Sequence, residues 1–110
     1  MKSAAFVSGN GEWENVGAGV TRKILGFDEA LMLVCVRFEP GSVGALHHHP
    51  HRQVTYVAAG RFEIEIDGVK RTLETGDSFF VAPELVHGAR ALEAGTLVDV
   101  FAPARQDFLK

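Results

Sequence analysis

The sequence predicts a single all-β domain folded as a jelly-roll barrel. Short runs of apolar or alternating residues recur about every 8–12 residues, the spacing typical of sandwiches and barrels. Twelve glycines and four prolines punctuate the 110 residues, and no long run has helical periodicity. A chain of this length has room for one hydrophobic core, so one domain is expected.

The first half of the chain carries three expected strands. Two weaker segments, 13–16 and 20–25, precede a strong run at 31–38. That run, Leu-Met-Leu-Val-Cys-Val-Arg-Phe, is apolar on both alternating faces, as in a strand that is covered on both sides. A small barrel covers only one side, so the run favours a homodimer. Glu39-Pro40-Gly41 follows as a turn, because proline sets its first corner and glycine can adopt a positive φ.

The second half is expected to form antiparallel strands joined by tight turns. Residues 62–66 alternate strictly, and Asp67-Gly68 after them is a strong hairpin signal. Gly76-Asp77 is a second turn, and the last two strands are expected to pair around 93–95. Only 104–110 has room for a helical turn. The expected strands are 54–57, 62–66, 69–73, 78–81, 86–92 and 96–101.

Composition excludes several classes of partner. Eleven basic and fourteen acidic residues give a net charge of −3, with no basic excess to bind a nucleic-acid backbone. The single cysteine cannot form an internal disulfide. No segment approaches the ~18–20 apolar residues of a membrane helix, and the apolar stretch within 1–9 is too short for a signal peptide. We therefore expect a soluble cytoplasmic protein that binds neither nucleic acid nor a membrane.

Histidine is distributed unevenly, since four of the five lie between positions 47 and 51. In an extended backbone alternate side chains share a face, so His47 and His49 project together, and Gln53 has the same parity. His87, on a later strand, is placed to close the site from across the barrel. Neutral imidazole suits zinc, copper, nickel or iron(II), so the pattern predicts a metal site. The alternative is a solvated loop or a set of hydrogen-bonded structural histidines.

Two motifs resemble those of the cupin family. The first reads Gly41, five residues, His47, one residue, His49, three residues, Gln53, six residues, Gly60, with glutamine where most cupins carry glutamate. The second matches in the spacing from Gly76 to His87 but departs from the cupin pattern at 82–84 and at Ala91. The resemblance covers about 30–102.

This resemblance implies a double-stranded β-helix with a metal ion held by His47, His49, Gln53 and His87. Gln53 supplies a neutral amide oxygen in place of a carboxylate. The metal would keep more positive charge as a result, which favours Lewis-acid chemistry on an anionic substrate.

The chain further resembles the pectin-degradation cupins of the KdgF type in four stretches, 15–25, 44–47, 92–105 and 107–109. On this resemblance nearly the whole chain is covered. It implies metal-dependent conversion of 4,5-unsaturated uronate monosaccharides, which pectin and alginate lyases release, to linear ketonised 4-deoxy-5-hexosulose uronate. It also implies one cupin domain over 1–110, divided into N-terminal strands at 13–25, a barrel core at about 30–102 and a short tail at 103–110.

One acid stands in the middle of the apolar strand at 96–101. Asp99 shares a face with Leu97 and Phe101. If that face lines the barrel, burial raises the pKa of Asp99 toward the range useful for proton transfer. The alternative is a solvated Asp99 on the outer face. The planar fork of Arg105 suits a sugar carboxylate, with Phe101 as a pocket wall, whereas a surface arginine and a core phenylalanine are the alternatives.

The leading hypothesis is an enzyme of the isomerase or lyase type with no redox step. Asp99 would move protons, and Arg105 would hold the carboxylate of a small anionic sugar. One divalent transition metal ion, which is nickel, zinc, iron or manganese, would polarise the oxygen atoms of that sugar. The alternatives are a small metal-dependent cupin dioxygenase or isomerase, and a non-catalytic sugar-binding cupin. The sequence assigns no role to His48 and His51 and does not distinguish a pectin-derived from an alginate-derived substrate.

Overall fold

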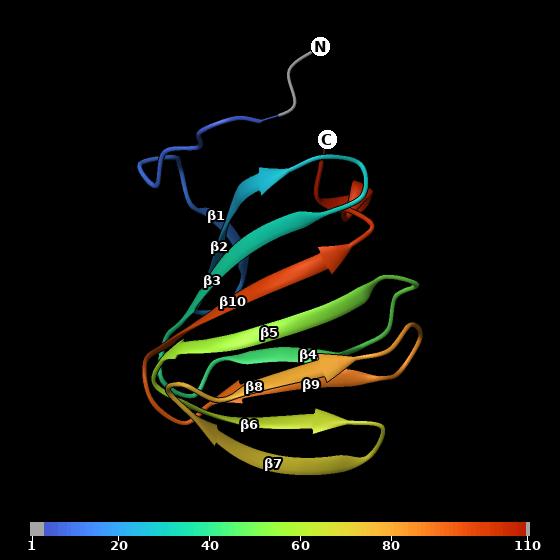
Figure 1. The fold of residues 1–110 in the computed structure, drawn as a ribbon. Helices are drawn as coiled ribbons and strands as arrows, with labels where there is room; N and C mark the ends of the chain where they lie inside the picture. The colour runs from blue at the N-terminus through green and yellow to red at the C-terminus, as the bar shows by residue number, and fades with distance from the viewer. Residues whose placement is uncertain (1–3, 110) are drawn as a thin grey trace.

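The computed structural model describes residues 4–109, which form ten β-strands in two sheets that pack face to face (Figure 1). The large sheet has the order β1-β2-β3-β10-β5-β8 and the small sheet β4-β9-β6-β7, with antiparallel neighbours throughout. The predicted all-β jelly-roll class is confirmed. Residues 1–3, which begin the stretch considered as a signal peptide, and Lys110 lie outside the described residues.

Most element positions agree with the expectations from the sequence. The strand Val43–His47 was not expected, because its residues neither alternate nor form an apolar run. The helical turn expected within 104–110 is present as a short 3-10 helix. In chain order the elements are β1 (Glu14–Gly17), β2 (Val20–Phe27), β3 (Met32–Phe38), β4 (Val43–His47), β5 (Arg52–Ala59), β6 (Arg61–Ile66), β7 (Val69–Glu74), β8 (Ser78–Val81), β9 (His87–Ala91), β10 (Gly95–Ala102) and η1 (Gln106–Phe108).

The expected pairing of the last two strands is wrong. β9 lies between β4 and β6 in the small sheet, whereas β10 lies between β3 and β5 in the large sheet. The short connection between them crosses from one sheet to the other and passes so closely over the core that a Cβ at Gly95 would lie 2.6 Å from the Phe62 ring. A connection of this length suits either a hairpin or a crossing, so the local sequence does not decide between them.

The core fills the space between the sheets. Phe38 of β3 and Phe62 of β6 meet edge to face, with ring centroids 5.1 Å apart. The expected inward face of β6 is confirmed, because Phe62 and Ile64 are buried. Around them one apolar cluster contains Val20, Phe38, Val57, Phe62, Ile64, Ala91 and Leu97, and a second contains Met32, Val34, Phe101 and Ala104.

The outer face of the large sheet is also apolar. One row across neighbouring strands runs through Phe80, Val54, Val100 and Leu33, and the next through Tyr56, Val98 and Cys35. The run at 31–38 is therefore apolar on both faces, as expected, and Cys35 is half-buried on the outer face. The part of the chain that the structure describes contains no helix long and apolar enough to cross a membrane.

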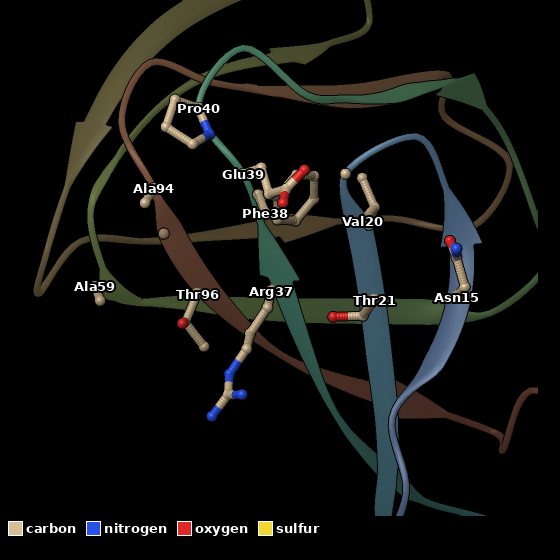
Figure 2. A pocket seen from close by; sticks show the side chains of 12 residues that line it. Asn15, Val20, Thr21, Arg37, Phe38, Glu39, Pro40, Ala59, Ala94 and Thr96 are labelled. Atoms are coloured by element: carbon tan, nitrogen blue, oxygen red, sulfur yellow. The ribbon is translucent and has the colours of Figure 1, made fainter.

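Two hollows lie toward opposite ends of the barrel. An open groove of about 560 Å³ is formed where β3 and β5 end and β2 and β10 begin (Figure 2). A cavity of about 260 Å³ extends between the sheets toward the beginning of β5 and the end of β10. Val20 and Phe38 line both hollows and lie between them.

Candidate functional site

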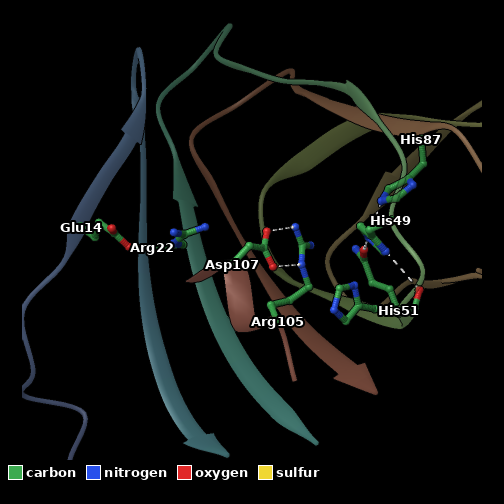
Figure 3. Close-up of polar contacts among 8 residues, drawn as sticks. Glu14, Arg22, His49, His51, His87, Arg105 and Asp107 are labelled. Carbon is green, nitrogen blue, oxygen red and sulfur yellow. Dashed lines mark hydrogen bonds and ion pairs between the residues drawn. The ribbon is translucent and has the colours of Figure 1, made fainter. Parts of the chain in front are cut away.

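Three histidines from the small sheet and a loop meet at one point beside the cavity. The register of β4 and β9 pairs His47 with His87, and the loop before β5 carries His49 to the same place. The rings of His47 and His87 are 4.3 Å apart between centroids. Those of His49 and His87, which are both drawn in Figure 3, are 4.9 Å apart. One nitrogen from each of the three lies within 4.8 Å of the others. The histidines that the sequence grouped are therefore brought together.

The backbone fixes the protonation of these rings. The Nδ1 atoms of His47, His49 and His87 lie 2.8, 3.1 and 2.9 Å from backbone carbonyl oxygens. Since a carbonyl only accepts hydrogen bonds, each Nδ1 donates, and in the neutral ring the lone pair is on Nε2. An imidazole held in this way is the form that binds a metal through Nε2.

Gln53 brings a fourth atom able to bind a metal, its amide oxygen, to the same point. Its Oε1 lies 3.0 Å from Nε2 of His49 and 3.1 Å from Nε2 of His87. The electron-rich Oε1 thus lies at hydrogen-bond distance from two nitrogen atoms that carry lone pairs. Protonating the rings would resolve the conflict, but burial lowers the pKa of His87 to about 4 and also lowers the pKa of His49. A cation among these neutral donors resolves it without an imidazolium, so the donor set fits a divalent metal ion.

Thr55 and Asp99 hold the amide of Gln53 in this orientation. Gln53 Nε2 donates to Thr55 Oγ1 at 2.9 Å and lies 3.4 Å from Asp99 Oδ1. Thr55 in turn donates to Asp99 Oδ1 at 2.5 Å. With both donor hydrogens directed at oxygen atoms, the amide turns its own oxygen toward the histidines. Thr55 was missed by sequence reasoning, although its parity with Gln53 on one strand was a usable signal.

Asp99 faces the interior, opposite Thr55 in the register of β10 and β5. Burial raises the pKa of Asp99 to about 6, against the opposing effects of the Thr55 hydrogen bond, the Arg105 charge and the Gln53 amide. A carboxyl group with this pKa exchanges its proton near neutral pH. Of the two orientations that the sequence left open, the inward one is observed.

Arg105 is buried beside Phe101, and its guanidinium lies 5.0 Å from the centre of that ring. Its Nε and Nη2 donate to the two carboxylate oxygens of Asp107 at 3.0 and 2.8 Å. This fork-to-fork pairing lowers the pKa of Asp107. Arg105 is therefore arranged to bind a carboxylate, and in this structure it binds that of the exposed Asp107.

The cavity joins these groups. Polar side chains line one part of it, and Val36, Phe79 and Leu97 give it an apolar floor. Arg22 of β2 and Phe108 of η1 also line it and were not singled out from the sequence, although Arg22 shares a strand face with inward-facing Val20. The polar lining residues are Arg22, His47, Gln53, His87, Asp99 and Arg105.

The two remaining histidines do not line the cavity. His48 is exposed, and its Nδ1 lies 2.9 Å from the carboxylate of Glu84. His51 packs against the rings of His49 and Phe101, with centroids 5.3 and 6.5 Å away. Neither offers an atom to the cluster of three.

Comparison with known proteins agrees with this geometry. The family model described as "Cupin domain" matches residues 34–101. The pectin degradation protein KdgF of Dickeya dadantii (strain 3937) is 45% identical over 106 residues, which cover 94% of this chain and 96% of that protein. Two solved structures superpose with a TM-score of 0.93. KdgF from Halomonas sp. is 41% identical and covers 97% of this chain and 100% of its own. An RmlC-like cupin from Shewanella frigidimarina NCIMB 400 is 45% identical and covers 97% of each.

Proposed function

The chain belongs to the cupin family, alongside pectin degradation proteins of the KdgF type, and we propose that it converts 4,5-unsaturated uronate monosaccharides to their linear ketonised form. The similarity to a pectin degradation protein, 45% identity over 94% of this chain, supports a role in pectin breakdown. The observation that carries the reaction is a buried carboxyl group with a pKa near neutrality, linked through Thr55 and Gln53 to three clustered histidines.

His47, His49, Gln53 and His87 would hold the metal ion, with nickel, zinc, iron and manganese as the candidates. When bound, such an ion supplies a positive charge that polarises substrate oxygens. All four side chains are neutral ligands, so none of them carries a negative charge that would offset that of the ion.

Ring opening redistributes one proton and leaves the atom count unchanged. The C1 hydroxyl loses its proton, the bond from C1 to the ring oxygen breaks, and C1 becomes an aldehyde. The electron pair stays on the ring oxygen as an enolate, and protonation at C4 then leaves a ketone at C5. Asp99 accepts the first proton and returns one at C4, which its pKa of about 6 allows at neutral pH. No oxidant or reductant is required.

Arg105 holds the substrate carboxylate in this proposal. Its guanidinium is buried and preorganised, whereas its counter-ion Asp107 is 57% exposed and free to move into water. A bound uronate would take the place of Asp107 on the planar fork. Phe101, stacked beneath Arg105, forms the wall of the site.

A second copy of the chain is the proposed partner at the outer face of the large sheet. Val54, Tyr56 and Phe80 are exposed there and adjoin Val98 and Val100 in a continuous apolar surface. Burying such a surface against its own copy removes it from water on both partners. Sedimentation velocity would give the mass of a dimer. A single functional domain over 1–110 and a cytoplasmic location stay predictions.

The test mixes metal-loaded protein with unsaturated monouronates released by pectin or alginate lyases. Loss of the ultraviolet absorbance of the conjugated double bond should be faster than in the protein-free control. Asp99→Asn should lower kcat by about 10²–10⁴-fold, the usual contribution of a positioned acid or base. Running both lyase products identifies the preferred sugar.

An unchanged rate of absorbance loss would overturn the proposal. Uronate binding without acceleration would then indicate a sugar-binding cupin. Oxygen consumption by the iron(II)-loaded protein would indicate a dioxygenase instead.

A further inference from the structure

Arg22 contributes a second guanidinium to the cavity. It lies on β2 between Val20 and Ile24 in the inward-facing row, opposite Val36 of β3. Its side chain is only 17% exposed. A charged group this far from water normally compensates its burial through partners.

The partners of Arg22 leave part of its donor capacity unused. Its Nε donates to Oε1 of Glu14 on β1 at 2.8 Å, and the Glu14 side chain is 56% exposed. Within residues 4–109 the two terminal Nη atoms have no hydrogen-bond acceptor. A guanidinium has five N–H groups, so most of its donors remain available to a molecule in the cavity.

Arg22 and Arg105 converge on one aromatic ring. The guanidinium carbon of Arg22 lies 3.6 Å from the centre of Phe108, and that of Arg105 lies 4.2 Å from the same point. Figure 3 shows Arg22 extending from β2 toward the Arg105–Asp107 pair. The two cations therefore line the cavity beside the same ring, although they are 83 positions apart in the sequence.

Each of these cations has an exposed carboxylate as its counter-ion. Glu14 pairs with Arg22, and Asp107 pairs with Arg105. A buried arginine with an exposed acid is an exchangeable pair, because the acid regains its hydration when an incoming anion replaces it.

We propose that Arg22 is a second anion-binding residue, which shares with Arg105 the carboxylate of a uronate in the cavity and selects acidic over neutral sugars. Glu14 is the counter-ion that competes with the ligand for Arg22. This inference rests on the proposed function for the class of substrate, but its test measures binding and does not require turnover.

A purely structural Arg22 would attach β1 to β2 through Glu14. The two roles make opposite predictions for Glu14. If the pair only anchors β1, removing the charge of either partner acts in the same direction. If Glu14 competes with a ligand, neutralising Glu14 strengthens uronate binding whereas neutralising Arg22 weakens it.

The experiment titrates galacturonate, a saturated uronate that lacks the reactive double bond, into metal-loaded protein by calorimetry. Arg22→Gln should weaken binding about tenfold, the loss expected for a charge-assisted hydrogen bond. Arg22→Lys, which keeps the charge but loses the fork, should fall between that variant and the wild type. Glu14→Gln should bind about threefold more tightly.

Three controls isolate the effect. Galactose, the neutral counterpart, should bind the wild type and Arg22→Gln equally. Arg71→Gln removes an equal charge from the exposed hairpin strand β7 and should leave galacturonate affinity unchanged. A metal titration checks that the histidine cluster of each variant is intact.

Equal affinity of wild type and Arg22→Gln for galacturonate would overturn the proposal, as would absence of galacturonate binding by the wild type. Weakening by Glu14→Gln would also overturn it, and this arm remains decisive if Arg22→Gln does not fold. Arg22-dependent binding without faster absorbance loss would support Arg22 and contradict the proposed function. If the wild type accelerates the absorbance loss and Arg22→Gln has the same KM as the wild type, the result would support the proposed function and contradict the role of Arg22.

Discussion

The open groove and the cavity at opposite ends of the barrel differ in the burial of their polar side chains, and the larger of the two has the fewer buried polar groups. The groove at one end is about twice as large as the cavity at the other, 560 against 260 Å³. Its polar side chains are exposed or already make local contacts, since Arg37 stacks on Trp13 at 4.0 Å and Glu39 packs over Gly19. A ligand there would meet groups that water already satisfies.

The cavity instead concentrates buried polar groups. Gln53, Thr55, His87 and Asp99 are all buried and are joined in one hydrogen-bonded network. Burying such groups costs free energy unless each has a hydrogen-bonding or charged partner. In the cavity, a bound cation or ligand would supply the partners of several polar atoms. Convergence of buried polar groups, rather than volume, is the reason for assigning the proposed chemistry to the cavity.

Removing one imidazole should produce the largest effect. His87→Ala is expected to weaken metal binding more than about 100-fold, because the cluster loses one of its three nitrogen donors. Calorimetric titration with nickel or zinc measures the affinity. His48→Ala is the matched control, since it removes an exposed imidazole outside the cluster. Tight metal binding by His87→Ala would contradict the assignment of the metal to this end of the barrel.

The next largest effect is on stability, in metal-free protein. The pKa of Asp99 is raised from 3.8 to about 6 on folding. Between these values the folded protein binds more protons than the unfolded protein, so this group loses stabilising free energy as the pH rises. Relative to Asp99→Asn, the wild type should lose about 2 kcal/mol of unfolding free energy from about pH 4 to about pH 7.

Urea denaturation at a series of pH values, with a chelator present, measures this difference. His87, whose pKa is lowered to about 4, acts in the opposite direction, because its contribution to stability falls as the pH falls from 6.5. That contribution is present in both proteins and cancels in the comparison. Parallel pH profiles of the two proteins would show that Asp99 is not buried as described.

A smaller effect is expected from the residue that orients Gln53. Thr55→Val removes the hydroxyl that accepts from the Gln53 amide and donates to Asp99, so the amide is free to turn its nitrogen toward the histidines. Metal affinity should fall about tenfold, the lower end of losses for residues that orient ligands. Thr55→Ser keeps the hydroxyl and should bind the metal with the affinity of the wild type. Wild-type affinity in Thr55→Val would show that Gln53 does not depend on this contact.

The smallest effect is expected at the large groove. Thr96→Val preserves the shape of a side chain that lines the groove and removes its hydroxyl. Metal affinity and the rate of absorbance loss should be unchanged, and the unfolding free energy should change by less than about 0.5 kcal/mol. A clear loss of rate in this variant would contradict the functional difference between the two ends.

Much of the fold followed from local signals. The Asp67-Gly68 hairpin is present as a turn with φ of 49° and 80°, which asparagine, aspartate and glycine adopt most readily. The strand Val43–His47 was missed because it pairs through its backbone and carries no apolar pattern. The β9–β10 pairing was wrong because a short connection looks alike whether it turns within a sheet or crosses between sheets.

By itself the sequence determined which side chains share a strand face. Gln53 and Thr55 lie on one side of β5, and Asp99 and Phe101 on one side of β10, because side chains of an extended backbone alternate with a period of two. Only the tertiary structure decided which faces meet. The pairing of β4 with β9 brings His87 to His47, the pairing of β5 with β10 places Thr55 beside Asp99, and Phe108 brings Arg22 to Arg105. Strand order and sheet packing arise from contacts between distant residues, and no local period encodes them.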